Sequence, residues 1–240
     1  MKRQYCYEYP KADHTVDAVV FCVESGEGGL AGALEVLLIQ RKSPPHRGAW
    51  ALPGGFIEMA EDLEEAIRRE LEEETGLRPD FLEQLHTFGT PGRDPRGRVI
   101  STAFMALVDK NDQPAQAGSD AADLRWTPVA SVLSGELPVA FDHREIIGVG
   151  VRRLRSKLPW QPVGSGLLPE EFSLAALLRI CEVILDRKLD KRIFRRKVLR
   201  FGVLEPTRRL RAGRHRPVQM YRFDRDAYRV LSARGVDFET

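Results

Sequence analysis

Residues 55–77 constrain this chain more than any other segment, because they join a glycine turn to glutamates at helical spacing. The turn at 50–55, WALPGG, leads into a helix-forming sequence. Glu73 and Glu74 follow Glu70 by three and four residues, so the three side chains share one helix face. Crowded carboxylates repel one another unless a cation neutralises them, and oxygen-rich groups suit Mg²⁺. The segment therefore predicts a metal-assisted phosphate site.

The same segment resembles the Nudix box, GX5EX7REUXEEXGU with U aliphatic, at every fixed position. The matching residues are Gly55, Glu61, Arg69, Glu70, Leu71, Glu73, Glu74, Gly76 and Leu77. The alternative is an acidic, solvated helix held by pairs of glutamate and arginine, which is the usual meaning of a charge run. Nine matches at fixed spacing favour the Nudix interpretation.

Length and composition favour a protein of two domains. At 240 residues the chain exceeds one average domain, and its 42% hydrophobic content is typical of a soluble protein. No apolar run approaches the roughly 18 residues that a membrane helix needs, and no secretory signal is visible, so we expect a cytoplasmic protein without membrane contact. The three cysteines lack disulfide or metal-type spacing and are expected to be reduced thiols.

Charge is divided unevenly along the chain. Residues 187–225 hold fifteen Lys and Arg against three Asp and Glu, whereas the rest holds 22 basic and 32 acidic residues. An acidic body with a basic segment near its end indicates one site for a metal and a small anion, and another for a polyanion.

Periodicity and turn residues predict the order of strands and helices. Buried strands are expected at 16–23 and 34–40, as a hairpin. Further strands are expected at 50–52, 82–88, 99–108 and 124–128. A helix that ends at Gly76 is expected between the first two of these strands, and another helix from 141 to about 158. Residues 159–169 are rich in Pro and Gly, so we predict domains at 1–158 and 170–240 with this linker between them.

The second domain has the element order of a winged helix. Ser173 is expected to cap a helix over 174–185, and Asp190 a second helix over 191–201. A short strand at 203–205, a basic loop at 207–217 and a strand at 218–223 follow. We expect double-stranded DNA as its partner, with solvated charge or a dimerisation module as the alternatives. The predicted DNA-binding residues are Lys191, Arg192, Arg195, Arg196, Arg200, Arg214 and Arg216.

Together the two halves resemble Nudix proteins with a C-terminal winged helix, a group that includes ADP-ribose pyrophosphatases and NrtR-type repressors of NAD biosynthesis. The resemblance implies an α/β fold, a Nudix α/β/α sandwich followed by a winged helix-turn-helix domain, and a homodimer. It also implies Mg²⁺ (or Mn²⁺) bound by Glu70 and Glu74, with support from Glu73 and a backbone carbonyl of the turn at Gly55. Glu70, Glu73 and Glu74 are the predicted catalytic residues, and Arg69 is expected to orient carboxylates.

Arginines in a Gly- and Pro-rich loop are the candidates for binding the substrate. Arg93, Arg96 and Arg98 could grip a phosphate or a ribose-linked anion with forked guanidiniums, although an exposed loop with incidental arginines is as good an interpretation. Asp142 and His143 could line the same site. An aspartate at the start of a helix is usually its N-cap, and this is what we expect of Asp142.

Three functions are compatible with these features. The first is Mg²⁺-dependent hydrolysis of the pyrophosphate of ADP-ribose, a nucleoside diphosphate-linked small molecule, to AMP and ribose 5-phosphate. The second is transcriptional regulation of NAD metabolism, with a Nudix domain that senses ADP-ribose and changes the DNA affinity of the winged helix. The third, sanitising oxidised nucleoside triphosphates, shares the box but gives no reason for the second domain.

Overall fold

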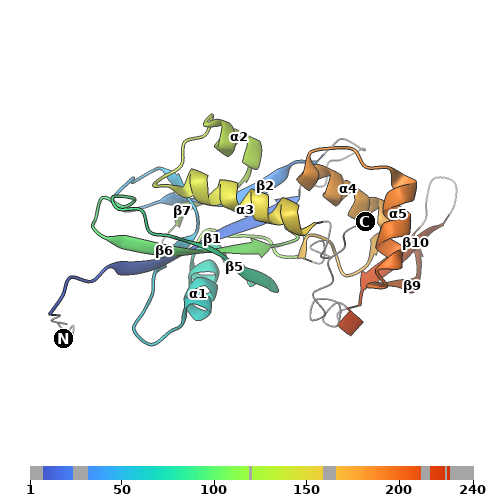
Figure 1. Ribbon diagram of the computed structural model, residues 1–240, viewed down its shortest axis with the longest axis horizontal. Coiled ribbons are helices and arrows are strands. Elements are labelled where there is room, and N and C mark those ends of the chain that lie inside the picture. The colour runs from blue at the N-terminus through green and yellow to red at the C-terminus, as the bar shows by residue number, and fades with distance from the viewer. Residues whose placement is uncertain are drawn as a thin grey trace.

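The computed structural model describes residues 8–23, 32–118, 121–158, 166–211, 217–224 and 226–227. A mixed sheet lies between helices at one end, and a smaller sheet with two helices forms the other end (Figure 1). The N-terminal sheet consists of β1 Asp13–Val23, β2 Leu34–Arg41, β3 Trp50–Ala51, β4 Gly54–Phe56, β5 Phe81–Phe88, β6 Val99–Leu107 and β7 Ala121–Pro128. Its helices are α1 Leu63–Thr75, α2 Val129–Ser134 and α3 His143–Lys157.

The large sheet has the strand order β3-β2-β1-β6-β5, with β4 paired to β1 and β7 to β2. The predicted hairpin is confirmed, because β1 and β2 are antiparallel with Phe21 opposite Val36. β1 and β6 are parallel over nine residue pairs, so the chain crosses over between them through α1 and β5. β1 therefore lies in the middle of the sheet.

Side-chain alternation along β1 divides the core into two layers. Val19 and Phe21 pack with residues of α3, whereas Ala18 and Val20 pack with Ile67 of α1 and its neighbours. Successive side chains of a strand point to opposite faces, so both faces of β1 are covered by a helix. α1 lies on one side of the sheet and α3 on the other, which confirms the predicted α/β/α sandwich (Figure 1).

Capping residues set both ends of α1. The side chain of Asp62 accepts hydrogen bonds from the backbone N–H groups of Glu64 and Glu65, and the side chain of Glu65 accepts one from the backbone N–H of Asp62, which completes a capping box. Gly76 adopts a left-handed conformation, with φ 70°, and ends the helix as predicted. The glutamates of this helix are thus fixed in register with the turn at 54–56.

The second unit has the predicted winged-helix order. It comprises β8 Phe172–Ser173, α4 Leu174–Leu185, α5 Lys191–Arg200, β9 Leu204–Arg211 and β10 Val218–Phe223, with the sheet order β8-β10-β9. Ser173 caps α4 and Asp190 caps α5, as expected. The basic loop expected from residue 207 was wrong at its start, because β9 continues to Arg211 in pairing with β10.

The two units share apolar contacts. Leu167 and Leu168, at the end of the expected linker, are buried in the same core cluster as Phe21 and Ile184. Arg155 of α3 donates from Nε to the carbonyl of Ile184 in α4, at 2.8 Å. Among the described helices, none is long and apolar enough to span a membrane.

Candidate functional site

The turn at Gly54 and Gly55 joins α1 to the central strand. Gly54 has φ 149° and pairs with Asp17 of β1, and a Cβ there would overlap the carbonyl oxygen of Val16. Its backbone N–H donates to Oε2 of Glu74 at 2.8 Å. A Cβ at Gly55 would overlap the carboxylate of Glu70. Glycine at residue 54 therefore permits the close approach of β1, and glycine at residue 55 leaves room for the carboxylate of Glu70.

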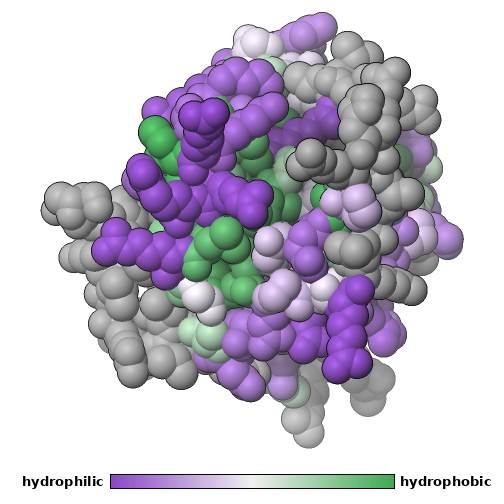
Figure 2. Space-filling view, turned by 90° about the vertical axis from the view of Figure 1, so that its right-hand side faces the viewer, coloured by the Kyte–Doolittle hydropathy of each residue, from purple (hydrophilic) through white to green (hydrophobic). Residues whose placement is uncertain are grey.

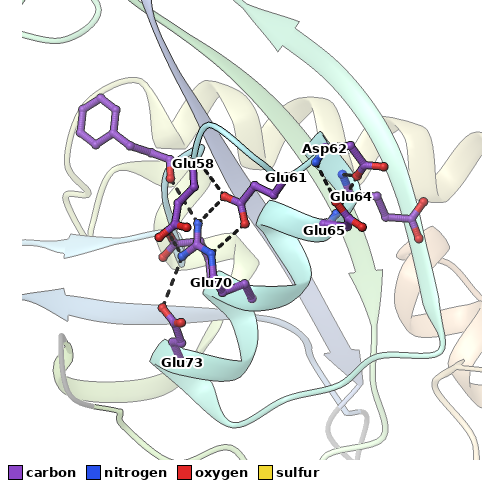
Figure 3. Close-up of polar contacts among 9 residues, drawn as sticks. Glu58, Glu61, Asp62, Glu64, Glu65, Glu70 and Glu73 are labelled. Atoms are coloured by element: carbon purple, nitrogen blue, oxygen red, sulfur yellow. Dashed lines mark hydrogen bonds and ion pairs between the residues drawn. The ribbon is translucent and has the colours of Figure 1, made fainter. Parts of the chain in front are cut away.

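Arg69 binds three of the glutamates. It donates to Glu61 at 2.7 and 2.9 Å, to Glu70 at 2.8 Å and to Glu73 at 3.3 Å. Figure 3 labels these three glutamates and marks hydrogen bonds of this group with dashed lines. Hydrogen bonds from Arg69 lower the pKa of Glu61 to about 2, and those carboxylates in turn raise the pKa of Arg69. Arg69 thus occupies the orienting position expected for it.

The carboxylates of α1 differ in their surroundings. Burial raises the pKa of Glu70, with the hydrogen bond from Arg69 opposing it, whereas the side chain of Glu73 is 56% exposed. Within the described residues no three His, Cys, Asp or Glu side chains are arranged to hold a metal. The carboxylate oxygens of Glu70 and Glu74 lie at adjacent glycines, and oxygen ligands of this kind suit a hard divalent cation. A cation bound there would favour the ionised form of Glu70.

A small cavity of about 70 Å³ opens beside this turn. It is lined by Thr15, Asp17, Arg41, Leu52, Gly54, Gly55, Phe56, Arg93, Asp94, Arg96, Phe141 and His143. The structure therefore places two of the three predicted substrate arginines next to the glycine turn. Arg98 is exposed and is not among these lining residues.

The interpretation of Arg93 as an incidental, exposed loop residue was wrong. Its side chain is 5% exposed and donates to both oxygens of Asp142, from Nε at 2.7 Å and from Nη2 at 2.6 Å. Burial opposes the charge of Arg93, yet Asp142 raises its pKa. The simple N-cap expected of Asp142 was also wrong: it occupies the N-cap position of α3 but makes no side-chain cap hydrogen bond, because Arg93 takes both carboxylate oxygens.

Arg96 and two aromatic rings form the mouth of the cavity. The guanidinium of Arg96 lies 4.8 Å from the ring centre of Phe56 and 5.7 Å from that of Phe141. The carboxylate of buried Asp94 accepts three hydrogen bonds from this guanidinium, two from Nε and one from Nη2 of Arg96. Phe141 has φ 52°, a left-handed conformation that is rare for a bulky residue and concentrates at functional sites.

His143 and Asp17 form the floor of the cavity. Nδ1 of His143 accepts a hydrogen bond from the backbone of Leu52 at 2.8 Å, so the neutral ring carries its proton on Nε2, which lies 3.6 Å from Oδ1 of Asp17. Burial lowers the pKa of His143, which favours that neutral ring. Sequence reasoning missed Asp17, although a charged residue within an apolar strand was a usable signal. It also missed Phe56 and Arg41.

A basic surface covers α5. The five predicted DNA-binding residues of this helix, Lys191, Arg192, Arg195, Arg196 and Arg200, are all exposed. Phe194 and Val198 pack against the core, and hydrophilic side chains surround an apolar area on this end of the molecule (Figure 2). Arg214 and Arg216 lie outside the described residues. The arrangement can meet several phosphates at once.

Two family models match the chain. The NUDIX domain model matches residues 13–148, and the NrtR DNA-binding winged helix domain model matches residues 164–223. Together they cover both structural units.

Similar proteins include regulators and enzymes. An ADPR responsive transcriptional repressor NtrR of Acinetobacter baylyi is 34% identical, over 90% of this chain and 84% of its own. An ADP-ribose pyrophosphatase of Methanocaldococcus jannaschii is 44% identical, over 47% of this chain and 63% of its own. The structure of Shewanella oneidensis NrtR complexed with a 27mer DNA matches with a TM-score of 0.76 and 34% identity, over 90% of this chain and 95% of that one.

Proposed function

Because this chain belongs to the Nudix family and carries an NrtR-type winged helix domain, we propose that it is a transcriptional regulator of NAD metabolism that senses ADP-ribose. The observation that carries the proposal is the joint match of both units to a repressor and to a DNA-bound structure over 90% of the chain. A relative that has the Nudix domain alone would support a ligand site but no DNA partner.

The glycine turn and the surface around it form the proposed ADP-ribose site, and the cavity of about 70 Å³ would hold only one part of the ligand. Arg96 lies at the mouth of this cavity with two aromatic rings, which suits a ligand that combines phosphate with a planar base. Arg93 supports the floor through Asp142, so we propose a positioning role for it, and Arg98 remains a candidate for an outer contact. ADP-ribose would change the DNA affinity only if it binds the DNA-free and DNA-bound arrangements unequally.

The exposed cations of α5 are the proposed contacts to the phosphates of double-stranded DNA. Each phosphate contact that forms adds to the dependence of the affinity on salt. We expect Arg196→Gln and Arg200→Gln to weaken binding about equally on every sequence, as phosphate contacts do. Arg214 and Arg216 would extend this surface, and a homodimer would present two such helices to two half-sites.

A gel-shift assay against the protein's own genomic neighbourhood, repeated with ADP-ribose, tests the regulator. We expect specific binding at modest salt and an altered affinity with ADP-ribose. Arg152→Gln, which changes an exposed arginine on the far unit, is the matched control for loss of positive charge. Equal affinity for operator and random DNA at modest salt would contradict the proposal.

A second candidate is Mg²⁺-dependent hydrolysis of ADP-ribose, and the position of Glu70 and Glu74 at the glycine turn favours it. These two carboxylates would hold the cation, with Glu73 and the carbonyl of Gly55 as further ligands. The bound cation would neutralise the pyrophosphate and make a water more acidic. Arg69 orients Glu70 and Glu61, and Glu70, which would lie beside the cation, is the proposed acceptor of the proton from that water.

Release of AMP from ADP-ribose tests the enzyme. Glu74→Gln should nearly abolish turnover with Mg²⁺ or Mn²⁺ while the fold stays intact, because the amide keeps the acceptor for the N–H of Gly54 but loses the charge. Glu72→Gln, on an exposed glutamate of the same helix, is the matched control. Tight ADP-ribose binding without turnover in the wild type would leave the chain a pure sensor.

A further inference from the structure

A second and much larger cavity, of about 950 Å³, lies where the two units meet. Its walls come from the start of β2, from α2 and α3 on one side, and from α4 and α5 on the other. Clefts between domains are a common position for ligand sites, and this volume lies within the range of small-molecule pockets.

Basic side chains outnumber acidic ones around this junction cavity. Six basic and two acidic side chains line it: Arg155, Arg179, Arg187, Lys188, Lys191 and Arg195 against Glu182 and Asp186. Glu182 is already occupied, because it accepts from Lys188 at 3.1 Å and from the backbone of Leu189 at 3.0 Å. In the parts of the chain that the structure describes, the other five cations form no ion pair. The cavity therefore carries a surplus of positive charge.

Arg179 is a second indication of a site for an anion. Its Nη2 atom is buried and has no hydrogen-bond partner among the described residues. A buried donor of this kind is costly unless something accepts from it, and a bound anion would do so once the guanidinium turned toward the cavity that Arg179 lines.

The rest of the lining is apolar. Leu34 and Val129 contribute from the sheet side, and Leu174, Leu178 and Phe194 from the winged helix. A fatty acid would use the apolar wall but needs only one cation, whereas inorganic phosphate would leave the apolar wall uncovered. A ligand with a planar aromatic part and several negative charges fits both features.

We propose that the junction cavity binds a nucleotide with at least two phosphates, held by arginine and lysine without a metal. Two of its cations, Lys191 and Arg195, belong to the α5 surface assigned above to DNA. A nucleotide in the cavity therefore draws these side chains away from DNA phosphates and weakens DNA binding. This second consequence rests on the proposed DNA-binding function, whereas nucleotide binding itself does not.

Calorimetric titration of ADP into the full chain tests the site. The protein used for this titration is the Glu70→Gln, Glu74→Gln double variant in EDTA, so that the proposed metal site cannot bind the nucleotide through a cation. We expect ADP to bind, and inorganic pyrophosphate to bind more weakly because it leaves the apolar wall uncovered. Arg155→Gln and Arg179→Gln should each weaken ADP binding about tenfold or more, since each removes a charge-assisted hydrogen bond. Arg152→Gln, three residues from Arg155 on α3 and exposed, should leave it unchanged.

Ala130→Trp provides a variant that keeps every charge. Ala130 is an exposed residue of α2 that lines the cavity, so an indole there should block ADP without disturbing the core. Added ADP should raise the dissociation constant for operator DNA, and Ala130→Trp should remove that effect. The proposal is overturned if ADP does not bind, or if Ala130→Trp and at least one arginine variant bind it within threefold of the parent. The second of these results would mean that ADP binds outside the junction cavity.

Discussion

The buried pair between Arg93 and Asp142 supplies a sharp prediction about how the ligand cavity is held. Two hydrogen bonds of 2.6 and 2.7 Å connect the loop before β6 to the start of α3, and the two side chains are 5% and 18% exposed. Asp142→Asn preserves the shape of the side chain but removes its charge. Arg93 would then be a buried cation with a weaker partner.

The expected loss of stability follows from this geometry. Removing one partner of a fully buried ion pair costs about 3–5 kcal/mol. The partial exposure of Asp142 and the remaining carboxylate of Asp17, 3.9 Å from Nη2 of Arg93, reduce that cost. We expect the free energy of unfolding to fall by about 2–3 kcal/mol. Glu72→Gln removes a partner of Arg78 in an exposed pair and should cost less than about 1 kcal/mol.

Urea unfolding at pH 7, followed by tryptophan fluorescence, measures both variants. A double-mutant cycle with Arg93→Met and Asp142→Leu should give a coupling energy above about 1 kcal/mol, because the two residues bind each other directly. If Asp142→Asn costs no more than Glu72→Gln, the pair does not hold the loop, and Arg93 is free to bind a ligand directly.

Three further predictions concern the α1 site. Glu61 has its pKa lowered to about 2, so its stabilising effect is present above pH 4.5 and is lost as the pH falls toward 2; urea unfolding of Glu61→Gln and wild type should converge over that interval. Gly54→Ala should lower the free energy of unfolding by more than about 3 kcal/mol or prevent folding, since the new Cβ meets the Val16 carbonyl. Gly76→Ala has open space around the new Cβ and should lower it by about 1 kcal/mol in the same measurement. Mg²⁺ should raise the melting temperature of the wild type but not that of Glu70→Gln with Glu74→Gln, as seen by calorimetry.

Local patterns in the sequence predicted the elements of the fold well. Short apolar runs located β1 and β2, and the caps at Ser173 and Asp190 located α4 and α5, because these signals act within a few residues. The β4 strand was not predicted, since its three residues gain their partner from β1, some 40 residues away in sequence. The length of β9 likewise depends on β10, and a basic sequence gave no sign of it.

The site was predicted only where its residues are close in sequence. The glutamates of α1 and their link to Arg69 follow from helical spacing. The pairing of Arg93 with Asp142 spans 49 residues, and no local pattern indicates which arginine of a loop is buried. For the same reason Asp142 was interpreted as a cap, because its competing partner could not be seen. The junction cavity depends on how the two units pack, which lies beyond any pattern of residues.

Fluorescence anisotropy of labelled operator DNA with the full chain, with and without ADP-ribose, tests the central proposal most directly. The account predicts specific binding that weakens steeply with salt and an affinity that changes at least fivefold with ADP-ribose, the lower end of typical coupling between two sites. An affinity for the operator that ADP-ribose leaves unchanged, or no preference for the operator over random DNA, would contradict it.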